Sequence, residues 1–131
     1  MKKVLFWIAI PVLIVFLGFV AYTFSSIYKS VEKITNTAKT EFHRDAVYSL
    51  IDLVNSDNHD FEEKNQAIWA IGQYADTSAL PFLEKLNSET GVDSIPFDRK
   101  MGFSKKEIER AIKWCTKGNC TSWMYRKIKS P

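Results

Sequence analysis

Residues that could support catalysis or metal binding are few and scattered along this 131-residue chain. The two histidines, His43 and His59, fall on different expected elements, and neither has a second histidine or cysteine at ligand spacing. The adjacent carboxylates Glu62 and Glu63 would point in different directions from a helix, so they do not form an acid–base pair. The sequence also lacks a nucleophile elbow and a glycine-rich phosphate loop. It therefore predicts no enzyme, and no catalytic, cofactor-binding or metal-binding residues.

Cys115 and Cys120 are the two cysteines, and their side chains would point apart on a continuous helix. The expected helix stops near Gly118, however, and a turn there would bring their Cα atoms within the roughly 4.4–6.8 Å that a disulfide requires. We therefore expect a disulfide if this part of the chain is outside the cytoplasm. The alternative is a buried thiol at Cys115 and an unrelated thiol at Cys120.

Trp69 is the tryptophan best placed to contact a partner. It lies beside Ile68 but off the line of Ile71 and Ala75 that an expected helix would bury. Exposed aromatic side chains on helices are frequent hot spots of protein interfaces. We therefore expect Trp69 to be partly exposed and to be a candidate partner contact.

The N-terminus carries an uncharged run from Val4 to Phe24, preceded by Lys2 and Lys3. Roughly twenty apolar residues span a bilayer, whereas the apolar part of a signal peptide has about 7–15. Residues 1–25 therefore predict an uncleaved, single-pass signal anchor in a bacterial-type inner or cell membrane; the alternative is cleavage near Ser25. The short basic N-terminus favours a C-terminal domain outside the cytoplasm, although Lys29 and Lys33 oppose that topology.

Residues 26–40 continue the helical pattern through Ile27, Val31, Ile34 and Ala38. The stretch Thr35-Asn36-Thr37 is its weakest point, because these residues favour caps and turns over helix interiors. We expect a helical stalk, either continuous or broken at this point; the alternative is a plain linker to the domain that follows.

Residues 41–131 predict short helices separated by polar turns. The expected helices are Glu41–Val54, one capped by Asp60 and ending near Ala75, one capped by Ser78 with Pro81 in its first turn, and one capped by Ser104 and ending near Gly118. The long connection from Ser88 to Phe103 is expected to be fastened to the core by Ile95, Phe97, Met101 and Phe103.

An internal repeat adds to this pattern. A shift of 44 residues places Ala67-Ile68 on Ala111-Ile112 and Thr77-Ser78 on Thr121-Ser122, and the period is typical of HEAT and armadillo units. The stretch Ala67 to Leu86, with its turn Gly72-Gln73-Tyr74-Ala75-Asp76, resembles the HEAT-like repeats of phycobiliprotein lyases. The resemblance implies an all-α fold in which the membrane helix precedes a short α-solenoid of about five helices, ending in a basic cap.

The charges divide the chain into an acidic and a basic part. Residues 41–98 carry a net charge of −9, and residues 99–131 carry +8. The two parts would pair within the fold, or the basic C-terminal segment would contact anionic lipid headgroups. We expect no binding of nucleic acid, because no known binding motif is present.

These features predict a membrane-anchored, non-catalytic scaffold that presents a helical surface to another protein. One alternative is an accessory or lyase-like protein that holds a cofactor or pigment. Another is a membrane-associated inhibitor or immunity-type protein that uses its acidic half to occupy a basic target.

Overall fold

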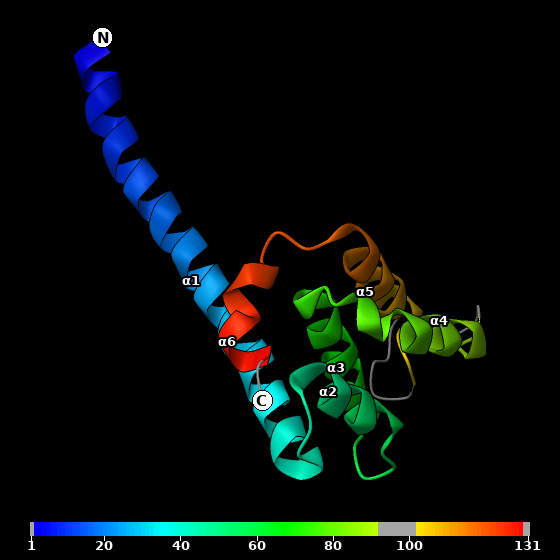
Figure 1. Cartoon of the computed structure of the whole chain (residues 1–131). Coiled ribbons are helices and arrows are strands. Elements are labelled where there is room, and N and C mark those ends of the chain that lie inside the picture. Colours follow the sequence, from blue (N-terminus) through cyan, green and yellow to red (C-terminus); the bar gives the residue numbers. More distant parts are fainter. Residues whose placement is uncertain (1, 92–101, 130–131) are drawn as a thin grey trace. The chain divides into compact units, whose positions relative to one another are not determined.

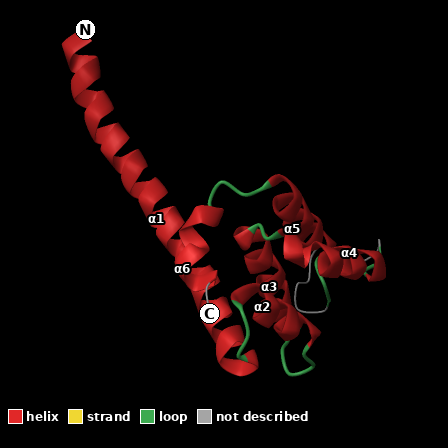
Figure 2. Ribbon diagram, viewed as in Figure 1, coloured by secondary structure: helices red, strands yellow, loops and turns green. Residues whose placement is uncertain are grey.

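The computed structural model describes residues 2–91 and 102–129, and helix is the only regular structure within these residues (Figures 1 and 2). Of the residues expected to fasten the long connection, Ile95, Phe97 and Met101 lie outside the described ranges. The elements are α1 (Lys2–Phe42), α2 (Ala46–Asn55), α3 (Phe61–Tyr74), the 3₁₀ turn η1 (Thr77–Ala79), α4 (Leu80–Glu89), α5 (Lys105–Lys117), the 3₁₀ turn η2 (Ser122–Tyr125) and α6 (Arg126–Lys129). The all-α prediction is confirmed for these residues.

The chain divides into two compact units, one ending at Ser30 and the other beginning at Val31. The first unit is the apolar part of α1, which continues through Pro11 without a break. By length and composition, α1 is long and apolar enough to cross a membrane, since its most apolar window has a mean hydropathy of 2.3 and is unburied. The expected apolar N-terminal helix is therefore present.

The expected helical stalk is present, and it is not broken at Thr35-Asn36-Thr37, because α1 continues as a helix to Phe42. The side chains of Val31, Ile34, Thr35 and Ala38 are buried in the second unit. The segment expected to be a stalk therefore supplies one face of the core, and the compact unit starts ten residues before the expected boundary at Glu41.

The predicted helix Glu41–Val54 is corrected at its start. His43 adopts a left-handed conformation, with φ of 54°, and its N–H donates to the carbonyl of Lys39 at 2.9 Å. This conformation ends α1, because a left-handed residue cannot continue a right-handed helix. The next helix, α2, begins only at Ala46.

The caps of α3 and α5 lie where the sequence predicts them. Asp60 Oδ1 accepts a hydrogen bond from the Glu63 N–H at 2.8 Å, and Ser104 Oγ accepts one from the Glu107 N–H at 3.4 Å. At the other end of α5, Gly118 has φ of 84°, which glycine adopts without a steric cost. These local signals define both helices.

The cap predicted at Ser78 is wrong. Asp76 instead caps η1, and its Oδ1 accepts from the Ser78 N–H at 2.9 Å. The cap position of α4 falls to Ala79. Pro81 nevertheless lies in the first turn of α4, as expected, where its missing N–H has no helical partner to lose.

Helix α3 lies at the centre of the second unit and packs against both α2 and α5 (Figure 1). Gly72 marks the closest approach of α3 to α5: a Cβ added there would lie 2.8 Å from Trp114 Cε3 and 3.0 Å from Ala111 Cα. The buried apolar residues along α2 to α6 are Ala46, Val47, Leu50, Leu53, Val54, Ala67, Ile68, Ala70, Ile71, Tyr74, Ala79, Leu83, Leu86, Ile108, Ala111, Cys115, Tyr125 and Ile128.

The 44-residue spacing of the sequence recurs in the structure. Helices α3 and α5 begin 44 residues apart, at Phe61 and Lys105, and each is followed by a 3₁₀ turn and a further helix. Equivalent positions also meet, because Cys115 Sγ donates to the carbonyl oxygen of Ile71, 44 residues earlier, at 3.9 Å.

Candidate functional site

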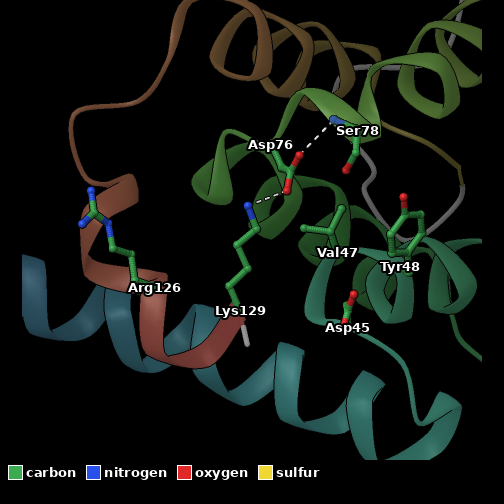
Figure 3. Close-up of a pocket in the computed structure, with 7 residues that line it drawn as sticks. All are labelled: Asp45, Val47, Tyr48, Asp76, Ser78, Arg126 and Lys129. Atoms are coloured by element: carbon green, nitrogen blue, oxygen red, sulfur yellow. Dashed lines mark hydrogen bonds and ion pairs between the residues drawn. The ribbon is translucent and has the colours of Figure 1, made fainter. Parts of the chain in front are cut away.

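A surface pocket of about 310 Å³ lies between the start of α2, the turn η1 and helix α6 (Figure 3). Its lining residues are Asp45, Val47, Tyr48, Asp76, Ser78, Arg126 and Lys129. Val47 of α2 and Ile128 of α6 are both buried in the core, and α2 contacts both η1 and α6. The polar neighbours of these two residues in the chain are thereby brought to one place on the surface.

Asp76 is held firmly on one side of the pocket. Its Oδ2 lies 2.5 Å from Lys129 Nζ, and its Oδ1 accepts from the Ser78 N–H (Figure 3). Burial alone would raise the pKa of Asp76, but the hydrogen bonds from Lys129 and Ser78 outweigh it and hold the pKa below its ordinary value. The carboxylate thus stays ionised and fastens α6 to the turn after α3.

Tyr48 forms an aromatic edge of the pocket and remains 41% exposed. The guanidinium carbon of Arg44 lies 5.0 Å from the centroid of its ring, and Arg44 in turn pairs with Asp52 at 2.9 Å. These contacts hold an exposed aromatic side chain in place, which is the usual chemistry of an interface hot spot.

The pocket combines donors, acceptors and one aromatic ring. Asp45 and Arg126 both lie at exposed positions, so the rim offers charge of either sign to a ligand. Its volume is at the lower end of the roughly 300–1,000 Å³ of small-molecule sites. Within residues 2–91 and 102–129, no three His, Cys, Asp or Glu side chains gather as metal ligands would. The arrangement offers room, charge and hydrogen-bonding groups for a small polar group.

The structure does not bring the predicted site residues together. Trp69 is half-buried on α3, as expected, but it does not line the pocket. The most exposed tryptophan of the second unit is Trp123, which is 65% exposed in η2. Trp123 lies between polar Ser122 and apolar Met124 in a four-residue turn, so no periodic stripe in the sequence marks it as exposed.

The predicted disulfide is not formed, and both cysteines are free thiols. Cys115 is buried on the face of α5 that packs against α3, where its thiol donates to Ile71. Cys120 is exposed beyond the end of the helix at Gly118. Cys115 belongs to the buried face of α5. Its side chain is therefore directed into the core and away from the turn that carries Cys120.

His59 makes a two-sided contact that the sequence analysis missed. Its Nε2 lies 2.7 Å from Glu41 Oε2 and its Nδ1 lies 2.9 Å from Glu63 Oε2. Burial would lower its pKa, but the hydrogen bonds with Glu63 and Glu41 raise it above the ordinary value. The spacing of His59 and Glu63 was a local signal for one half of this contact. The contact with Glu41 has no local signal, because only the fold brings the end of α1 close to His59.

Comparisons with protein-family models, with curated proteins and with solved structures found no match for this chain. The class that the described residues define is an all-α protein with one long apolar N-terminal helix.

Proposed function

We propose that this protein is a membrane-anchored, non-catalytic scaffold that binds another protein at the pocket around Tyr48. The observation that carries the proposal is the exposed Tyr48 ring, held by Arg44 at the edge of a pocket with charges of both signs. Interfaces concentrate their binding energy in such aromatic and arginine residues.

The supporting fold is a short HEAT-like stack. The stack has two repeats, α3–η1–α4 and α5–η2–α6. Their first helices begin 44 residues apart. The close approach at Gly72 and the contact between Cys115 and Ile71 join the two first helices. Repeat stacks suit binding, because neighbouring units together form an extended surface.

The anchor is the apolar part of α1, retained as a signal anchor, with the second unit outside the cytoplasm. The length of the apolar run and the basic residues before it support this topology. Phosphatase and fluorescent-protein fusions after Pro131 test it. Fluorescence without phosphatase activity would place the second unit in the cytoplasm instead.

Photo-crosslinking tests the binding surface in the full chain in its native membrane. A photoreactive amino acid in place of Tyr48 should give one dominant adduct of defined mass. The same amino acid in place of Lys85, whose side chain is 74% exposed on α4, is the matched control and should not give that adduct. Arg126→Ala should weaken the Tyr48 adduct by removing a charge from the rim.

Two outcomes would contradict the proposal. Identical adducts from positions 48 and 85 would show non-selective collision, and the absence of any protein adduct at Tyr48 would remove the binding surface. Visible absorbance of the purified full chain would instead favour the alternative of a pigment-holding protein.

A further inference from the structure

Helix α5 carries a stripe of basic side chains on its solvent side. Lys106, Lys113 and Lys117 are exposed, and Arg110 is half-buried between them. Their spacing of three or four residues places all four within a narrow sector of the helix. Arg110 pairs with the buried Glu107 at 3.2 Å, whereas the three lysines extend into solvent. The exposed Glu109 lies beside this stripe, which keeps a net positive charge along α5.

The segment after α5 stays close to the C-terminal end of this stripe. Asn119 and Thr121 both donate to the side-chain oxygen of Gln73, at 3.3 and 3.1 Å. Gln73 follows Gly72, the residue on which α5 packs most closely. Trp123 and Lys127 are exposed within this C-terminal segment. We call Lys106, Lys113, Lys117, Trp123 and Lys127 the basic face.

Trp123 lies toward the end of the second unit at which the chain enters it. The Tyr125 ring contacts that of Tyr74, whose hydroxyl lies 2.9 Å from that of Thr35. Three residues later, the carbonyl of Ile128 accepts from Lys39 at 3.3 Å. The C-terminal segment and α1 therefore run in the same direction, and residues before Tyr125 lie toward Val31 rather than Phe42.

We propose that the basic face lies on the surface of an anionic lipid bilayer. Lysines next to an anionic surface and a tryptophan at the level of the headgroups are the two side-chain types that membrane interfaces favour. Because the apolar part of α1 anchors the chain in the proposed function, an anionic bilayer is the polyanion nearest to the basic face. Only residues 25–30 separate the apolar run from the compact unit at Val31, and so short a segment spans no more than about 25 Å even when extended.

The test uses the full chain reconstituted into vesicles, with an environment-sensitive fluorophore on Cys120. Cys120 is exposed and lies in the chain between Lys117 and Trp123 of the basic face, whereas Cys115 is buried and stays unlabelled. The emission should shift to the blue in vesicles containing phosphatidylglycerol, relative to vesicles of phosphatidylcholine alone. Raising the salt concentration should reverse the shift, because screening weakens attraction to the lipid charges.

Charge reversal identifies the residues responsible. Each lysine near an anionic surface contributes about a five-fold factor to binding, and each glutamate adds repulsion, so the triple variant K106E/K113E/K117E should weaken the contact by at least about 100-fold. The shift should then be absent at all lipid compositions. The matched control K85E changes an exposed lysine on α4 and should keep the shift. Trp123→Ala should reduce the shift but leave its dependence on salt.

The lipid comparison on the unmodified chain keeps the proposal testable even if a variant folds poorly. Equal emission in the two kinds of vesicle would overturn it, as would a normally folded triple variant that keeps the full shift. A response to added single-stranded DNA in neutral vesicles, without a response to phosphatidylglycerol, would also overturn it and assign the basic face to nucleic acid.

Discussion

The hydroxyl oxygens of Thr35 and Tyr74 lie 2.9 Å apart in the interior of the second unit, although 39 residues separate them in the chain. Thr35 is fully buried and Tyr74 is nearly so. The ring of Tyr74 also contacts that of Tyr125, with 5.5 Å between their centroids. One tyrosine on α3 therefore joins the last part of α1 to the turn that precedes α6.

Replacing Thr35 with Val should destabilise the second unit by about 1 kcal/mol, because it removes a buried hydrogen-bond partner of Tyr74 with little change in shape. Thr37→Val is the control, since Thr37 is exposed and its hydroxyl bonds only to Lys33 of the same helix turn. Urea unfolding of the full chain in detergent measures both. If both substitutions change the free energy of unfolding equally, the buried hydrogen bond between Thr35 and Tyr74 does not stabilise the fold.

Gly72→Val should destabilise the fold by roughly 1–3 kcal/mol, because added side-chain atoms overpack a full site. A Cβ added to Gly72 would lie 2.8 Å from Trp114 Cε3 and 3.0 Å from Ala111 Cα, both closer than ordinary van der Waals contact. Gly91→Val provides the comparison, because nothing lies within 4 Å of a Cβ there. If the two variants melt at the same temperature, α3 and α5 do not pack through Gly72.

The contact of His59 with Glu41 and Glu63 predicts a dependence of stability on pH. Since the pKa of His59 is raised in the folded chain, its stabilising contribution is fully present below the unfolded value of about 6.5. That contribution is lost as the pH rises through the higher folded-state pKa. Thermal melts of the full chain and of His59→Gln should therefore converge as the pH is raised.

His43→Gln is the control for this experiment, because His43 is exposed at the end of α1. Its melts measure the effect of replacing a histidine that lies outside this contact. A constant difference between the unmodified chain and His59→Gln at every pH would show that His59 acts through packing and not through its charge.

The two cysteines should react at very different rates with an alkylating reagent. Burial raises the pKa of Cys115 to about 11, and the nearby charge of Asp76 adds to the effect, so little of this thiol is ionised at neutral pH. Mass spectrometry of non-reduced protein should show one rapid modification, at Cys120, and a second only after unfolding. A molecule that gains no label even when unfolded would contain the disulfide between the two residues.

The helices that the sequence predicts well are those whose ends are coded locally. Asp60, Ser104 and Gly118 each act within a few residues, so their chemistry is visible without the fold. The apolar stripe of α5 and the length of the N-terminal run are equally local.

The errors arise where distant contacts override local preference. Thr35 favours turns in isolation, but burial against Tyr74 keeps it within a helix. His43 takes the left-handed conformation, which histidine adopts more often than most residues but too rarely for its type alone to mark the end of α1. The pocket joins α2, η1 and α6, and such a meeting of separate segments follows only from the packing of the core.

The bond between Lys39 and the carbonyl of Ile128 spans 89 residues, and it has a consequence for the order of folding. The second unit is closed by its last few residues, which reach α1 and Asp76 only after the rest of the chain has been synthesised. Contacts of such long range form late, because the intervening loop must first be ordered. During synthesis α1 emerges first and these closing residues emerge last, so the second unit completes its core against a helix that was made well before them.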